Sequence, residues 1–104
     1  MRKASSVSHD KEMIKLFRKD PKFATEYLNS AVQAAFKENE PELVLIALSL
    51  VSRAFGMTKL AKRAAVRRES LHRMLHKRGN PEWNSLFRVF RALRLRPRLE
   101  SAPL

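Results

Sequence analysis

The chain of 104 residues contains no cysteine, and it has only three histidines. The missing cysteines exclude a disulfide framework, a thiolate metal site and a cysteine nucleophile. So few histidines also argue against acid–base or nucleophilic catalysis. We therefore predict that the protein is not an enzyme, and that it uses no metal and no cofactor.

Long apolar runs are missing as well. The most apolar segment, residues 43–51, is interrupted by Ser49 and is too short to cross a bilayer. The first ten residues lack the apolar stretch of a signal peptide. These absences predict a cytoplasmic protein with no membrane partner.

Acidic residues are scarce in the second half of the chain. The whole sequence has 22 Lys and Arg against 10 Asp and Glu, a net charge of +12. Residues 1–56 carry a net charge of +2, whereas residues 57–104 carry +10. Such a concentrated positive field favours binding to nucleic-acid phosphates with release of counterions. The alternative is a solvated basic surface that keeps a small protein soluble.

The apolar periodicity predicts an all-α fold of five or six helices. We divide the chain into a flexible segment (1–10), an N-terminal helical extension (11–40), a helix-turn-helix domain (41–95) and a C-terminal arm (96–104). Asp20-Pro21 is a helix start, because the carboxylate accepts from free N–H groups and proline fits the first helical position. The segment 42–55 is apolar almost all round, which predicts a helix at the centre of the core that ends at Gly56.

The segment 58–74 has the spacing of a helix-turn-helix. Ala61 is small where two helices must cross, and Leu60 and Ala64 flank it on the inward face. The apolar residues Leu71 and Met74, with Leu75, give the second helix one apolar stripe, and its opposite face is cationic. A packed inside with a cationic outside suits insertion into the DNA major groove. We expect this recognition helix to run from about residue 68 to residue 77.

Ten residues are predicted to contact DNA. Arginine can bind O6 and N7 of guanine and glutamate can accept from N4 of cytosine, so the base-reading candidates are Arg67, Arg68, Glu69, His72 and Arg73. The free N–H groups of a helix start can hold a phosphate, so the backbone-contacting candidates are Thr58, Lys59, Lys77, Arg78 and Asn80.

Each of these assignments has a plainer alternative. Thr58 can be an ordinary helix cap, and Arg68 or Arg73 can pair with Glu69 on a solvated helix surface. The basic residues after the recognition helix can simply form an exposed turn. Glu69, His72 and His76 have a spacing that suits a metal, but no fourth ligand is apparent and the neighbours are cationic.

A last helix is expected from about residue 83 or 84 to residue 93. Its apolar residues, together with Trp83, are predicted to lie in the core, with a dimer contact as the alternative for Trp83. Beyond it, Pro97 forbids a continuous helix, so residues 95–100 are expected to form a short extended arm.

From Asp20 onward the chain resembles the probable addiction-module antidote proteins, a family of Cro/repressor (Xre)-type helix-turn-helix proteins. These are the antitoxins of bacterial toxin–antitoxin gene pairs. The resemblance lies in an ordered set of short motifs: Asp20-Pro21 with Tyr27-Leu28-Asn29, Pro41-Glu42-Leu43, Gly56-Met57-Thr58-Lys59-Leu60-Ala61, Arg68-Glu69-Ser70-Leu71, and Gly79-Asn80-Pro81 before a helix that ends at Ala92-Leu93.

The resemblance implies a homodimer that binds an operator in double-stranded DNA, represses its own operon and is associated with the nucleoid. It also implies a cognate toxin of the small ribonuclease type. Three residues depart from the family pattern. Ala65 stands where the motif turn has glycine, Arg67 stands where the recognition helix has a serine cap, and Arg94 replaces a glycine after the last helix.

The sequence can be compared with three alternative functions. The first is a toxin-neutralising interaction protein whose DNA binding is weak or lost. The second is a small basic ribonuclease, which needs a sheet that this sequence does not predict. The third is general RNA binding, which the sequence does not support. Its phenylalanines have the helical spacing of core residues and do not form a platform for stacking bases.

Overall fold

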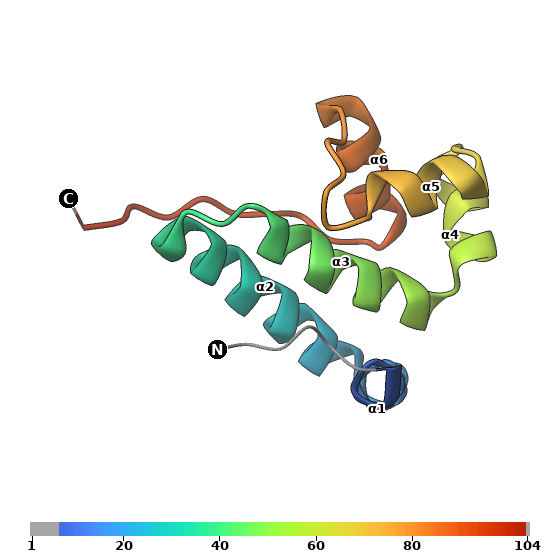
Figure 1. Ribbon diagram of the computed structural model, residues 1–104, viewed down its shortest axis with the longest axis horizontal. Coiled ribbons are helices and arrows are strands. Elements are labelled where there is room, and N and C mark those ends of the chain that lie inside the picture. Colours follow the sequence, from blue (N-terminus) through green and yellow to red (C-terminus); the bar gives the residue numbers. More distant parts are fainter. Residues whose placement is uncertain (1–6, 104) are drawn as a thin grey trace.

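The computed structural model describes residues 7–103, and this part of the chain contains six helices and no strand. The predicted all-α class is confirmed (Figure 1). The helices are α1 (Val7–Lys19), α2 (Pro21–Glu38), α3 (Glu42–Phe55), α4 (Met57–Ala64), α5 (Arg68–Met74) and α6 (Trp83–Ala92).

Helix α3 lies at the centre of the molecule. It contacts α1 and α2 on one side and α4 on the other (Figure 1). Its buried residues include Leu45, Leu48 and Leu50, and even Ser52 has no exposed surface. An apolar helix without a polar face is stable only when it is surrounded by other helices, so the predicted central position is confirmed.

The ends of α2 and α3 follow from local sequence signals. The Asp20 side chain accepts from the backbone N–H of Phe23 at 3.2 Å, and Pro21 is the first helical residue. Gly56 ends α3 with a φ of 111°, a conformation that glycine adopts at little cost. The chain then bends by 102° into α4.

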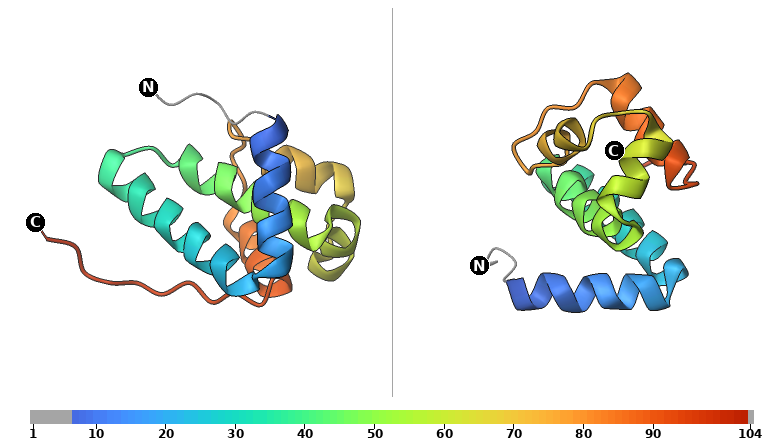
Figure 2. Two further views of the ribbon diagram at one scale, coloured as in Figure 1. Left: turned by 90° about the horizontal axis from the view of Figure 1, so that it is seen from below. Right: turned by 90° about the vertical axis from the view of Figure 1, so that its right-hand side faces the viewer.

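Helix α1 crosses α2 and α3 as a separate layer (Figure 2). It begins at Val7, so residues 7–10 are not the flexible segment predicted from the sequence. Asp10 forms a salt bridge with Arg53 of α3 at 3.2 Å, which fixes this first turn. At the other end of α1, Arg18 donates to the carbonyls of Arg53 and Ala54, at 3.3 and 3.0 Å. The prediction for residues 1–6 lies outside the described residues.

Helix α5 ends at Met74, three residues before its predicted end at Lys77. The chain turns there because Gly79 lies against the end of the helix and donates from its N–H to the carbonyl of His76 at 2.6 Å. A Cβ atom at residue 79 would lie 2.8 Å from that carbonyl oxygen and 3.0 Å from the carbonyl oxygen of Arg73. Only glycine fits this close approach without a shift of the turn.

Helix α6 packs against α4, and its buried residues are Val89 and Ala92. The prediction that Trp83 lies in the core is wrong, because 66% of its surface is exposed. Phe87 was also expected in the core and is 49% exposed, with its ring centroid 5.8 Å from that of Trp83. These two residues are four apart, so they share one face of α6, and that face is exposed.

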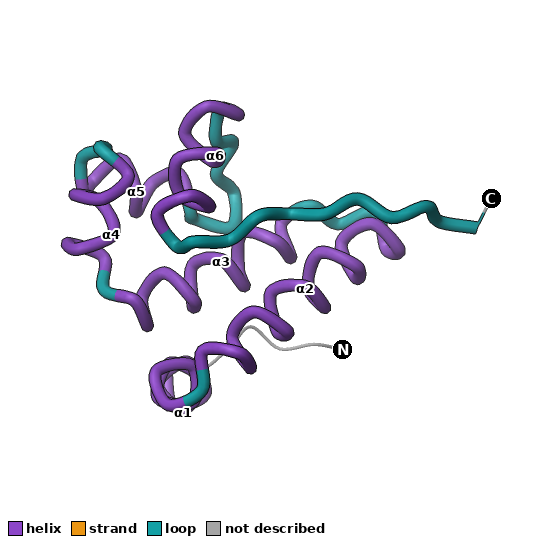
Figure 3. The backbone as a smooth tube through the Cα atoms, turned by 180° about the vertical axis from the view of Figure 1, so that it is seen from behind, coloured by secondary structure: helices purple, strands orange, loops and turns teal. Residues whose placement is uncertain are grey.

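The segment after α6 contains no helix and runs back across the molecule (Figure 3). No single helix in the described part of the chain is long and apolar enough to span a membrane. Helices α3 and α4 meet the requirement only as a pair, by length and composition, and they are sharply bent.

Candidate nucleic-acid interface

Helices α4 and α5 are joined by a turn of three residues, 65–67. Ala65 has φ 57° and ψ 44°, the left-handed conformation that glycine adopts most readily. Its N–H donates to the carbonyls of Ala61 and Lys62, and the N–H of Val66 donates to Ala61 at 3.0 Å. This closure resembles the usual glycine-ended helix terminus, but alanine adopts it at a cost of about 1 kcal/mol.

The inner faces of α4 and α5 are buried as the sequence predicted. Leu60 and Leu71 have no exposed surface, and Ala61 and Ala64 are 4% and 3% exposed. Met74 completes the apolar stripe of α5. The small alanines let the helices approach closely, and the leucines fix the orientation of α5 on the core.

The outer face of α5 carries polar residues alone. Arg68, Glu69, His72 and Arg73 are all exposed. The Nη2 atom of Arg73 is 3.5 Å from the Ser70 hydroxyl. Glu69 forms no salt bridge with Arg68 or Arg73 in the described part of the chain. The four side chains are therefore available to an external ligand.

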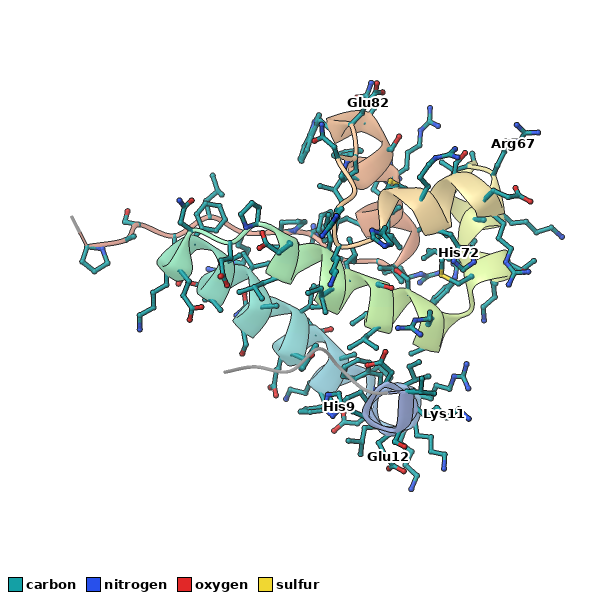
Figure 4. All side chains as sticks on the ribbon, in the orientation of Figure 1. His9, Lys11, Glu12, Arg67, His72 and Glu82 are labelled. Carbon is teal, nitrogen blue, oxygen red and sulfur yellow. The ribbon has the colours of Figure 1, made fainter. Side chains whose placement is uncertain are left out.

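Arg67 is the residue before α5 and has an extended backbone, with φ −74° and ψ 146°. Its side chain makes no capping hydrogen bond, so the first N–H groups of α5 lack the acceptor that serine would supply. Figure 4 shows Arg67 pointing outward from the turn and His72 farther along α5. Arginine at this position therefore provides no cap, but it adds a positive charge at the start of the exposed face of α5.

Thr58 and Lys59 are exposed on the first turn of α4. Thr58 is not the helix cap, because Gly56 occupies the cap position and no side chain caps α4. The Lys59 ammonium lies 4.8 Å from the ring centroid of Phe55, and Arg63 lies 5.4 Å from it. Cation–π contacts hold these side chains beside the end of α3. Arg63 is a further cation on this surface and is not among the ten residues predicted to contact DNA.

The remaining candidates lie in the turn after α5. Lys77, Arg78 and Asn80 are exposed, and the Arg78 N–H donates to Nδ1 of His76 at 3.1 Å. A groove of about 730 Å³ runs between this turn and the start of α6, and its lining includes Arg73, His76, Arg78 and Asn80. The groove therefore brings Arg73 together with Arg78 and Asn80, two of the residues predicted to contact phosphates. Thr58 and Lys59 do not line this groove.

The spacing of Glu69, His72 and His76 does not form a metal site. In the part of the chain that the structure describes, no three His, Asp or Glu side chains are grouped closely enough to hold a metal ion. His76 instead lines the groove beside Arg73.

Comparisons with known proteins agree with the resemblance to the antidote proteins. The model of a family described as "Probable addiction module antidote protein" matches residues 10–101. An uncharacterized protein of Haemophilus influenzae is 38% identical over 69 residues, which cover 66% of this chain and 67% of that protein. No solved structure matches the chain.

Proposed function

Because the chain belongs to the family of probable addiction module antidote proteins, we propose that it is an antitoxin that represses its own operon by binding operator DNA. Membership of this family implies a cognate toxin as partner. We assign α4 and α5 to a Cro/repressor (Xre)-type helix-turn-helix, with α5 as the helix that enters the major groove.

One observation carries the DNA-binding part of the proposal. Helix α5 has a fully buried side at Leu71 and an opposite side on which Arg68, Glu69, His72 and Arg73 are exposed without an ion pair. A helix held in this way presents its polar side chains in a fixed orientation, as readout of base edges requires. The net charge of +10 on residues 57–104 favours the same ligand.

The contacts fall into two classes. Arg67, Arg68, Glu69, His72 and Arg73 are assigned to base edges. Thr58, Lys59, Lys77, Arg78 and Asn80 are assigned to phosphates, where they fix the position of α5 but carry no sequence information. Two copies of the chain would bind half-sites about one helical turn apart, roughly 34–36 Å between centres.

The test measures binding to the DNA upstream of the chain's own gene, with a random duplex of equal length as competitor. We expect the logarithm of the association constant to fall linearly with the logarithm of salt concentration, with a slope of about −0.9 per phosphate contact. The change Arg68→Ala should weaken operator binding roughly tenfold and leave random-duplex binding less affected. A matched control is Lys11→Ala, which removes one exposed positive charge from α1, far from α5 (Figure 4).

Two results would refute DNA-binding repression. One is equal affinity for the upstream DNA and the random duplex. The other is equal weakening by the substitutions at Arg68 and Lys11, which would mean that only net charge matters.

A second candidate function is toxin neutralisation with weak or lost DNA binding. The left-handed Ala65 and the missing side-chain cap at Arg67 favour it, because both destabilise the start of α5. Co-expression with the toxin separates the two: the double variant Arg68→Ala/Arg73→Ala should still rescue growth. If this variant is folded and fails to rescue, the toxin-binding and DNA-binding surfaces overlap.

A further inference from the structure

The chain leaves α6 through a defined turn. Leu93 caps the helix, and Arg94 has a left-handed φ of 62°. The N–H of Leu95 donates to the carbonyl of Phe90 at 2.9 Å, and Leu95 packs partly against the core. This anchor fixes the point at which residues 96–103, which we call the C-terminal arm, depart from the domain.

The arm is an extended, exposed segment that contains no helix. All of residues 96–103 are exposed, and Leu99 is 99% exposed. No backbone N–H or carbonyl of the arm forms a hydrogen bond with any residue in the described range 7–103. A row of unpaired backbone groups on an extended segment is the feature that pairs with the edge of another sheet.

The prolines of the arm determine which of its edges can pair. In a strand, the N–H and carbonyl of alternate residues point to the same edge. Pro97 and Pro103 both occupy odd positions, so the edge formed by odd residues lacks two N–H donors. The even positions 96, 98, 100 and 102 all retain their N–H groups. The arm can therefore extend a sheet through one edge only.

The side chains of the arm alternate in the same way. Arg96, Arg98 and Glu100 share one face, whereas Leu95 and Leu99 share the other. A partner strand that suits this arm has carboxylates near the first face and an apolar pocket near the second.

The direction of the arm favours a protein partner over DNA. In Figure 1 the arm runs toward the end of the molecule beyond the C-terminus of α2, whereas α4 and α5 lie at the opposite end. The long axis of the molecule measures 40 Å. A DNA duplex bound at α5 would thus lie away from the exposed part of the arm.

We propose that the C-terminal arm binds the cognate toxin as an added β-strand, pairing through the backbone groups of residues 96, 98, 100 and 102 with an acidic sheet edge. This inference rests on the proposed function, because it takes the partner to be the toxin that the family implies. On binding, the arm gains the hydrogen bonds that its backbone lacks in the free protein.

The experiment measures the affinity of the full chain for the toxin encoded beside its gene, by titration calorimetry. Glu100→Pro removes an N–H from the pairing edge, Glu100→Ala keeps that N–H but removes the carboxylate, and Ser101→Pro removes an N–H from the edge that Pro97 already blocks. We expect Glu100→Pro to weaken toxin binding by about tenfold or more, and the other two variants to stay within about threefold of the wild type. All three positions are exposed, so the melting temperature should not change.

Several outcomes overturn the proposal. Equal affinities of Glu100→Pro and Ser101→Pro would exclude pairing through one edge, and full affinity after removal of residues 96–104 would exclude the arm altogether. If Glu100→Pro weakens operator binding instead of toxin binding, the arm contacts DNA. If Glu100→Pro changes the molecular mass of the protein without toxin, measured by sedimentation, the arm binds a second copy of this chain. A full-length chain that does not bind the toxin at all refutes the antitoxin function itself, whereas the outcomes above leave that function standing.

Discussion

Replacing Ala65 by glycine should stabilise the protein. Ala65 has φ 57° and ψ 44°, and a left-handed backbone costs an L-residue roughly 1–2 kcal/mol. Glycine removes this cost but adds about 0.5–1 kcal/mol of conformational entropy to the unfolded chain. Because the side chain of Ala65 is exposed, the change loses little packing. With the middle of each range, about 1.5 less about 0.75 kcal/mol, the net gain in the free energy of unfolding is about 0.5–1 kcal/mol.

Thermal unfolding followed by far-UV circular dichroism measures this gain. For a domain of this size, 1 kcal/mol corresponds to a shift of about 4–8 °C in Tm, so Ala65→Gly should raise Tm by about 2–8 °C. Asn39→Gly is a matched control, since Asn39 has nearly the same backbone (φ 57°, ψ 47°) but asparagine tolerates it. Its Tm should rise by less.

A second control variant should change the free energy of unfolding in the opposite direction. Ala64 is the last residue of α4 and is only 3% exposed, so Ala64→Gly should lower the free energy of unfolding by about 1 kcal/mol. A Tm of Ala65→Gly at or below that of the wild type would refute the left-handed backbone at this turn. Shifts in Tm of the same sign for Ala65→Gly and Ala64→Gly would refute it as well.

Three further predictions concern stability and exposure. Gly79→Ala should lower the free energy of unfolding by about 1–3 kcal/mol in a denaturant titration, because its Cβ would clash with the carbonyls at the end of α5; an unchanged midpoint contradicts this. Leu71→Ala should cost about 2–5 kcal/mol in the same titration, because Leu71 is fully buried; a cost below 1 kcal/mol would mean that α5 is not packed as described. Trp83 is the only tryptophan and is 66% exposed, so acrylamide should quench its fluorescence efficiently in dilute solution; weak quenching there, growing weaker with concentration, would indicate that Trp83 is buried between two copies.

The sequence predicted the elements whose limits depend on near neighbours. The start of α2 depends on a hydrogen bond between Asp20 and Phe23, three residues apart. The end of α3 depends on Gly56 alone. The buried stripe of α5 depends on residues three and four apart, which helix geometry places on one face. Signals of this range can be read directly from the order of residues.

Other features depend on contacts that the order of residues does not contain. Helix α1 begins early because Asp10 pairs with Arg53, 43 residues away. Trp83 is exposed because α6 has apolar residues on two faces, and only the packing against α4 decides which face is buried. At the candidate interface, the sequence predicted which residues are exposed on α5. It did not predict that Arg73 shares a groove with Arg78 and Asn80, since that depends on the turn at Gly79.

The two departures from the family pattern in the turn before α5, Ala65 and Arg67, destabilise α5 without changing how it packs on the core. Alanine at residue 65 and the missing side-chain cap at Arg67 each cost about 1 kcal/mol. Both act on the turn, whereas the orientation of α5 depends on Leu71 and Met74, which remain buried. The fold requires this packed inner face in any case, because Leu71 is fully buried in the core. The departures therefore leave α5 in the same orientation but less stable at its start and more cationic. The left-handed alanine alone accounts for the gain in Tm expected from glycine at residue 65.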